Sequence, residues 1–279
     1  MPDVKKAVEK SYDELYRYSN YASENAEDDD VYKLNQIITQ KHPRRILDIG
    51  CGRGRLSITA AKAGIQVVAT DISHKAVLLS CEAVRSSTGI RIDGVVADAF
   101  NLPFRDNSFD AALMFGVMDY FEDKRQCFLE LKRTLAPGGE ALYTVRNKGI
   151  IYQLTRSHLF RRYWTLIWRS RDHTLNKERP NYKAYDDIAD LERPTSLRHN
   201  YQQLQDAGLL VVKVWGSSYT RVLVVYLESF LQRFGFSPNL LLKITRAVKA
   251  AIIRLENSPI TPYFSTNVTF RVSKQLRDE

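Results

Sequence analysis

The sequence predicts an α/β fold built on a doubly wound, mostly parallel sheet, and three observations support this prediction. Short apolar runs alternate with amphipathic helical patterns between residues 45 and 145. Glycines follow the first apolar run at alternate positions, and an acid lies at or near the end of each of the first three runs. Alternating strands and helices are typical of a parallel sheet that carries helices on both faces.

The first apolar run, residues 46–49, is predicted to be a buried strand, and a helix is expected from about residue 55 to residue 63. Between them lie Gly50, Gly52 and Gly54. Glycines remove the Cβ atoms where a small molecule has to approach the main chain, and the start of a helix presents unpaired N–H groups. This stretch is therefore predicted to be a ligand-binding loop.

The second run, residues 66–70, is followed directly by Asp71. A carboxylate at the tip of the second strand can accept both hydroxyls of a ribose, so the order of elements is typical of a nucleoside-binding half-sheet. The glycine spacing differs from the G-x-G-x-x-G pattern of dinucleotide enzymes, and Asp48 would repel a pyrophosphate. A cationic nucleoside is favoured, and a nicotinamide dehydrogenase is the alternative from another reaction class.

The other elements are predicted from capping residues and periodicity. Asp30 is expected to cap a helix over residues 31–41, and Ser73 a helix after Asp71. Further strands are expected at residues 90–97, 111–115, 140–145, 209–215 and 267–272, and further helices at residues 124–134 and 196–207.

The stretch LDIGCGRG, residues 47–54, resembles the first motif of class I S-adenosylmethionine-dependent methyltransferases of the type 11/25-like group, and Asp71 matches the acid that ends their second motif. The resemblance covers roughly residues 44–147. It implies a Rossmann-like seven-stranded sheet whose last strand is antiparallel, and S-adenosyl-L-methionine as the cofactor. It also assigns the ribose to Asp71, the adenine edge to Asp98 and the Ala99 N–H, and the methionine ammonium group to backbone carbonyls near Gly50 and Gly116. The candidate cofactor-binding residues are Asp48, Gly50, Cys51, Gly52, Gly54, Asp71, Ile72, Asp98, Ala99, Phe115 and Gly116.

The 279 residues contain no linker rich in glycine, serine or proline and no internal repeat, so a single domain is expected. Residues 1–43 are interpreted as an N-terminal helical lid, with tyrosine-rich residues 12–21 either covering the cofactor or packed against the domain. Residues 44–147 form the cofactor-binding core, residues 148–195 a basic and aromatic cap insertion, and residues 196–279 the rest of the sheet with a helical insertion at about 218–263.

The cap insertion is the part of the sequence that says most about the acceptor. Residues 146–179 hold nine basic side chains against two acidic ones, interleaved with five aromatic residues. Four interpretations remain open: an anionic or lipid-like acceptor, contact with an anionic membrane, binding of an RNA backbone, or a solvated helix that packs on the domain. Nucleic acid is the least favoured partner of the three ligand classes.

The sequence thus predicts an enzyme that transfers a methyl group to a small-molecule acceptor by in-line displacement, with a hydroxyl oxygen slightly preferred. Among the five histidines, His158 and His173 in the cap are the candidates for a general base. A cofactor-binding partner subunit without catalysis, and a methyltransferase acting on a membrane lipid or RNA, are the alternatives. No metal-ligand spacing is found, and three scattered cysteines without a signal-like or membrane-spanning run indicate a cytoplasmic protein of undetermined oligomeric state.

Overall fold

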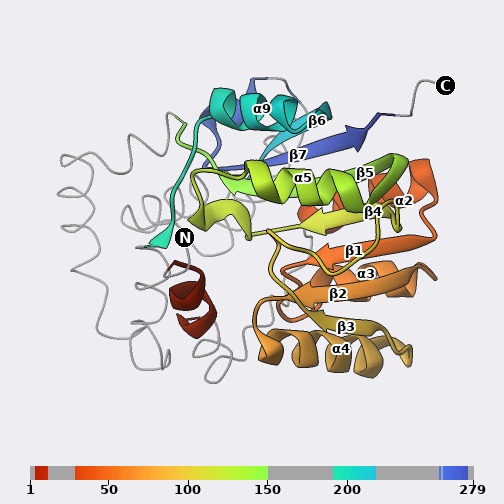
Figure 1. Ribbon diagram of the computed structural model, residues 1–279. Coiled ribbons are helices and arrows are strands. Elements are labelled where there is room, and N and C mark those ends of the chain that lie inside the picture. Colours follow the sequence, from red (N-terminus) through yellow and green to blue (C-terminus); the bar gives the residue numbers. More distant parts are fainter. Residues whose placement is uncertain (1–3, 12–28, 150–190, 218–257, 259, 276–279) are drawn as a thin grey trace, which may run out of the picture.

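The computed structural model describes residues 4–11, 29–149, 191–217, 258 and 260–275 (Figure 1). In these residues one seven-stranded sheet has the order β3-β2-β1-β4-β5-β7-β6. The strands are β1 (Arg45–Ile49), β2 (Gln66–Asp71), β3 (Asp93–Val96), β4 (Phe109–Met114), β5 (Leu135–Arg146), β6 (Leu209–Ser217) and β7 (Asn267–Lys274). The helices are α2 (Asp29–Lys41), α3 (Arg55–Lys62), α4 (His74–Thr88), α5 (Arg125–Thr134), α9 (Leu197–Asp206) and the short α12 (Thr261–Phe264), with a 3-10 turn η1 (Met118–Tyr120). Residues 4–11 are also helical and are called the N-terminal helix below.

Strands β1 to β5 run parallel, whereas β7 lies antiparallel between β5 and β6. This arrangement confirms the predicted fold class, including the antiparallel last strand. From β1 the chain builds outward through β2 and β3, and it then returns to the other side of β1 to form β4. A doubly wound sheet binds its ligands at such a reversal, outside the carboxyl ends of the strands.

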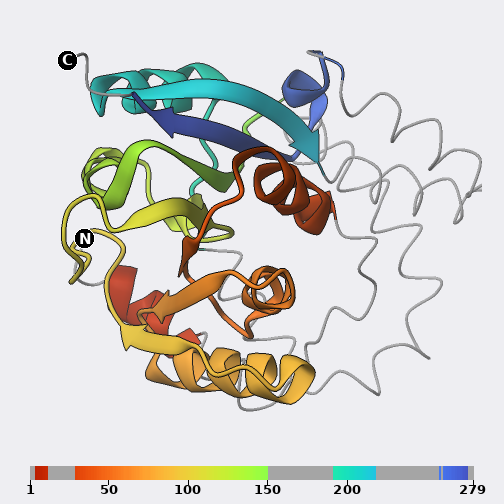
Figure 2. The ribbon, with the colours of Figure 1, turned by 90° about the vertical axis from the view of Figure 1, so that its right-hand side faces the viewer.

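Two apolar layers cover the faces of the sheet, as Figure 2 shows with α2 and α3 on one side and α5 on the other. Neighbouring strand residues point to opposite faces, so Ile46 and Leu142 pack in the layer with α2 and α3, while Leu47 and Tyr143 pack in the layer with α5 and α9. Because parallel sheets are covered on both faces, the strands read as nearly continuous apolar runs in the sequence.

Several element boundaries differ from the sequence prediction, and the starts of α2, β3 and β5 are examples. Helix α2 begins at Asp29, so Asp30 lies in its first turn and does not cap it. Strand β3 begins at Asp93, which pairs with Val68, so residues 90–92 do not belong to the ladder with β2. Strand β5 already begins at Leu135, which pairs with Phe109 ahead of an irregularity in the ladder. The expected cap Ser73 does accept a hydrogen bond from the first turn of α4. Ser196, predicted as the first residue of a helix, caps α9 in the same way.

The chain segments on either side of residues 150–190 are joined to each other. Asn147 pairs with Thr195 in a parallel bridge, and the Lys148 N–H donates to the Thr195 carbonyl at 3.1 Å. The Arg146 guanidinium forms an ion pair of 2.7 Å with Glu192. The two segments therefore lie side by side next to the end of β5.

The tyrosine-rich residues 12–21 of the expected lid, most of the cap insertion and most of the second insertion lie outside the described residues. Among the helices that are described, none has the length and apolar content needed to cross a membrane.

Candidate functional site

A cavity of about 710 Å³ lies at the carboxyl ends of β1, β2 and β4, where the strand order reverses. Its volume falls in the range of roughly 300–1,000 Å³ that is usual for small-molecule sites. The glycine loop, the loops after β2, β3 and β4, the beginning of α3, and two residues of the N-terminal helix, Lys5 and Val8, form its wall.

The glycine loop adopts a backbone that favours glycine. Gly50, Gly52 and Gly54 have φ angles of 71°, 50° and 77°, in the left-handed region that other residues rarely enter. The N–H groups of Gly50 and Cys51 donate to the Thr70 carbonyl at 2.7 and 3.0 Å, which ties the loop to β2. A Cβ at Gly54 would lie 2.6 Å from the Ser80 Oγ of α4, so this position also requires glycine for packing.

Asp71 ends β2 with its carboxylate on the wall of the cavity. One carboxylate oxygen accepts from the Gly52 N–H at 3.1 Å, and the other accepts from the Ser73 N–H at 3.0 Å. These bonds hold the carboxylate beside the glycine loop, in the place where the sequence analysis expects a ribose. The two backbone donors help to fix its orientation.

Asp48 is the most deeply buried acid on the cavity wall, with 3% of the residue exposed. Burial, together with the charge of Asp71, raises the pKa of Asp48 from 3.8 to about 6, and the hydrogen bond from the Ser57 hydroxyl opposes this rise. That hydroxyl donates to the Asp48 carboxylate at 2.6 Å. The Asp48 carboxyl is therefore mostly ionised only above about pH 6. A cationic ligand in the cavity would offset the free-energy cost of ionising this buried group.

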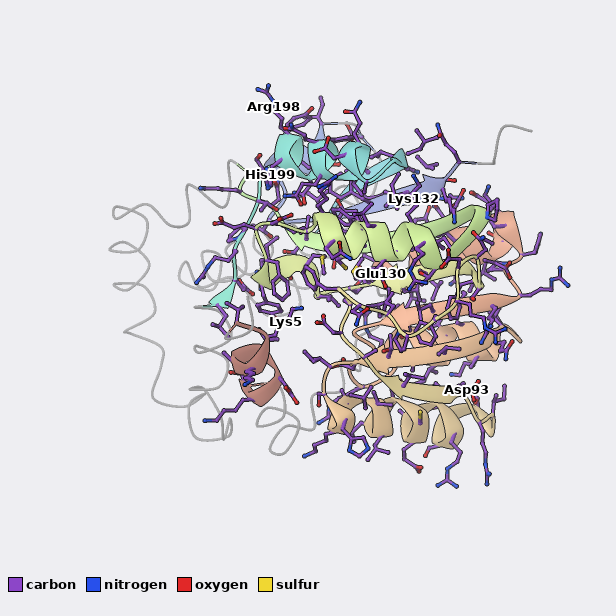
Figure 3. The ribbon with its side chains drawn as sticks, viewed as in Figure 1. Lys5, Asp93, Glu130, Lys132, Arg198 and His199 are labelled. Carbon is purple, nitrogen blue, oxygen red and sulfur yellow. The ribbon has the colours of Figure 1, made fainter. Side chains whose placement is uncertain are left out.

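Asp98 follows β3, and its carboxylate forms an ion pair with Lys5 of the N-terminal helix. Its other oxygen accepts from the Phe100 N–H at 3.0 Å. The loop that follows is fixed to α5, because the Glu130 carboxylate accepts from the Leu102 N–H at 2.8 Å. Figure 3 shows Lys5 pointing from its helix toward the sheet and Glu130 on α5. The Asp98 side chain is thus held between a cation and a rigid loop.

The exit of β4 forms the opposite wall. The Gly116 N–H donates to the Thr144 hydroxyl at 2.9 Å, and Tyr120 of η1 lines the cavity with only 6% of the residue exposed. Asp119 does not line the cavity: its carboxylate accepts from the Arg146 N–H at 2.6 Å. Burial raises the pKa of Asp119 to about 6. Its role in the structure is to fix η1 to the end of β5.

Ten of the eleven cofactor-binding candidates line this one cavity. They are Asp48, Gly50, Cys51, Gly52, Asp71, Ile72, Asp98, Ala99, Phe115 and Gly116. Gly54 lies behind the loop against Ser80. The wall also holds Lys5, Val8, Arg53, Arg55 and Tyr120, which the sequence analysis did not assign to the cofactor. Arg53 and Arg55 lie inside or next to the glycine motif, so their positions in the sequence could have identified them as cavity residues. No feature of the sequence indicated that Lys5 lies there.

The histidine candidates have a different outcome. His158 and His173 lie outside the described residues, so their assignment as bases stays a prediction. Of the described residues that line the cavity, none is a histidine. His199 lies on α9 (Figure 3), where its ring contacts the Glu122 carbonyl at 3.2 Å.

The doubly wound sheet, the glycine loop and the acid at the tip of β2 define a nucleoside-binding α/β domain. Residues 47–143 match the family profile described as "Methyltransferase domain". This part of the chain is therefore similar to a methyltransferase domain, as the resemblance of the glycine motif indicates.

Two relatives illustrate the similarity. Norajmaline N-methyltransferase from Rauvolfia serpentina is 36% identical over 107 residues, which cover 35% of this chain and 34% of that protein. Demethylmenaquinone methyltransferase from Paenarthrobacter aurescens (strain TC1) is 32% identical over 168 residues, 59% of this chain and 62% of the relative. The chain thus spans less than two thirds of the length of either relative.

A solved structure shares the fold over most of the chain. The [4+2]-cyclase SpnF superposes with a TM-score of 0.55 at 18% identity, covering 93% of this chain and 86% of the cyclase. At this identity the similarity shows the fold and says nothing about the reaction.

Proposed function

We propose that this protein transfers a methyl group from S-adenosylmethionine to a small-molecule acceptor by direct in-line displacement, with a hydroxyl oxygen as the preferred acceptor atom. The observation that supports the proposal is the cavity at the strand reversal. The glycine loop and the residues Asp48, Asp71 and Asp98 line this cavity. Three acids around one cavity fit a ligand that combines a ribose, an amine and positive charge.

When bound, S-adenosylmethionine supplies an electrophilic methyl group whose bond to sulfur breaks as the acceptor forms its own bond to the same carbon. The chain's own residues then have three tasks. Asp71 would hold the ribose hydroxyls, Asp98 with the Ala99 N–H would hold the adenine, and the charge of Asp48 would favour a cationic ligand. Placement of donor and acceptor can contribute up to roughly 7–11 kcal/mol, so few catalytic side chains are required.

The β4 side of the cavity supports an acceptor with an apolar or aromatic part. Phe115, Val117, Tyr120 and Phe121 line that wall, and the Phe100 ring packs edge-on against Phe121 at a centroid distance of 4.8 Å. Such a wall excludes water from the bound acceptor. From the basic residues of the cap insertion we propose that the acceptor is anionic or lipid-like. The same positive charge is compatible with peripheral contact with the cytoplasmic face of an anionic membrane.

A base is needed if the acceptor is a hydroxyl, because the oxygen has to lose its proton. His158 and His173 remain our candidates for this role, and replacing each by glutamine distinguishes them. We expect the variant of the true base to lose roughly 10²–10⁴-fold in kcat and to keep its affinity for S-adenosylhomocysteine.

The proposal is tested first by calorimetric titration with S-adenosylmethionine and S-adenosylhomocysteine, with NAD and NADP as controls. Binding of the first pair alone, followed by transfer of a labelled methyl group to compounds from an anionic and apolar acceptor panel, would support it. Binding of NAD or NADP alone would contradict it and favour a dehydrogenase.

A second candidate function is a cofactor-binding subunit that does not itself transfer methyl groups. The fold alone does not require methyl transfer, because a structure of the same fold is that of a protein called a cyclase. Tight binding of S-adenosylhomocysteine without methyl transfer to any member of the acceptor panel, or to lipid vesicles and RNA, would favour this function.

A further inference from the structure

The N-terminal helix contacts both sides of the cavity. On one side Lys5 forms its ion pair with Asp98 after β3. On the other side Val4 and Val8 pack against Tyr120 and Phe121 after β4. Lys5 and Val8 themselves line the cavity, so this helix spans the opening between two walls that belong to different strands. Figure 1 places it beside the carboxyl ends of the strands.

The Lys5 side chain joins this helix to the nucleoside side of the cavity. Its ammonium group contacts the Asp98 carboxylate and lies 4.3 Å from the centroid of the Phe100 ring. The side chains of Lys5 and Asp98 are 21% and 34% exposed, so water screens the pair only in part. An ammonium above an aromatic ring gains a further electrostatic attraction.

The Asp98 carboxylate can hold Lys5 and a ligand donor together. Its two oxygens offer about four lone-pair positions, and the Phe100 N–H and Lys5 account for two of them. The loop behind it is fixed by Glu130, so the carboxylate does not have to move when a further donor arrives. Lys5 and the amine of a ligand can therefore contact the Asp98 carboxylate at the same time.

We propose that Lys5 is a positioning residue of the cofactor site: through Asp98 it holds the N-terminal helix across the cavity, so that the nucleoside leaves only after the Lys5–Asp98 pair has opened. This inference rests on the proposed function, because the ligand concerned is the cofactor or its demethylated product. It adds a role in product release for a residue outside the glycine motif.

The experiment measures release of radiolabelled S-adenosylhomocysteine from the full chain after addition of excess unlabelled ligand. The variants are Lys5→Met, which removes the charge and keeps the length, and Lys5→Arg, which keeps the charge. Lys6→Met is the matched control, because Lys6 is exposed on the same helix. Thermal melting of each variant shows whether it is folded.

We expect Lys5→Met to release the product about three- to tenfold faster at low salt, with Lys5→Arg and Lys6→Met close to the wild type. Raising the salt to about 1 M shortens the Debye length to roughly 3 Å, so release from the wild type should accelerate toward the rate of Lys5→Met, which itself should change little. A general loss of structure would not produce this salt pattern or the rescue by arginine.

Release from Lys5→Met at or below the wild-type rate, with normal binding, would overturn this inference alone. The salt dependence of the wild type is a second test that needs no variant, and a rate independent of salt would also overturn it. Absence of any binding by the wild type would instead overturn the proposed cofactor function and this inference with it.

Discussion

Replacing Asp48 by asparagine tests the electrostatics of the cavity, because this carboxyl is buried and its ionisation is costly. Its pKa is 3.8 in an exposed setting and about 6 in the folded protein. A shift of about 2 pKa units corresponds to roughly 3 kcal/mol at 1.36 kcal/mol per unit. The side chain is almost completely buried, so solvent screening does not reduce this value much.

Because the pKa of Asp48 is raised in the folded protein, this group lowers the stability as the pH rises. Between about pH 4 and pH 6 the unfolded chain has lost the Asp48 proton while the folded chain still holds it, so the stability that this group contributes falls as the pH rises. Above about pH 6 both states are ionised and the penalty stays constant. Asparagine cannot ionise, and the cost of burying its amide does not change with pH.

We therefore expect the stability of Asp48→Asn relative to the wild type to be higher at pH 8 than at pH 4.5. The difference between the two unfolding free energies, variant minus wild type, should increase by about 2 kcal/mol. Urea unfolding at the two pH values measures this difference directly. Ser57→Ala serves as the companion variant, because removing the hydroxyl that donates to Asp48 should enlarge the pH dependence. A difference between wild type and Asp48→Asn that is the same at both pH values would refute the reasoning.

Three further predictions concern the same framework. Asp71→Ala should weaken S-adenosylmethionine binding by roughly 1.5–3 kcal/mol, and a loss smaller than twofold in titration calorimetry would remove the ribose assignment. Gly54→Ala should destabilise the fold clearly more than Gly64→Ala in urea unfolding, since both glycines have a φ of 77° and only Gly54 has a neighbour in the way; equal losses would contradict the packing argument. Arg133→Met should lower stability at pH 7, because the Arg133 hydrogen bonds hold the pKa of Glu130 below its ordinary value of 4.5. That loss should shrink only as the pH falls from about 4.5, where Glu130 becomes protonated in the unfolded chain, through the lower pKa that Glu130 has in the folded protein.

The residues that the sequence identified well are those whose role depends on neighbours along the chain. The acid, the three glycines and the start of α3 lie within eleven residues of one another, so their spacing alone places them at one strand end. Ser73 was recognisable as a cap for the same reason, since a cap bonds to an N–H two or three residues further on.

Other features depend on contacts between distant segments and leave little trace in local spacing. Lys5 meets Asp98 across 93 residues of sequence, and nothing in the charged N-terminal segment indicates which lysine does so. Asp119 accepts from the Arg146 N–H at the end of β5, a partner 27 residues away that local spacing does not indicate. Strand β3 begins only at Asp93, where its pairing with β2 begins opposite Val68, and this pairing joins two separate segments of the chain.

The pairing of Arg146 to Lys148 with Glu192 to Thr195 has a consequence for how such a domain can be altered. Because the chain leaves the core and returns to it at adjacent points, the sheet and the glycine loop do not depend on the length of what is inserted between residues 149 and 191. Closing a longer or shorter loop between fixed ends changes the free energy only slowly, by about 0.6 kcal/mol for each doubling. This junction is therefore a natural place to exchange one substrate-recognition module for another while the cofactor half is kept.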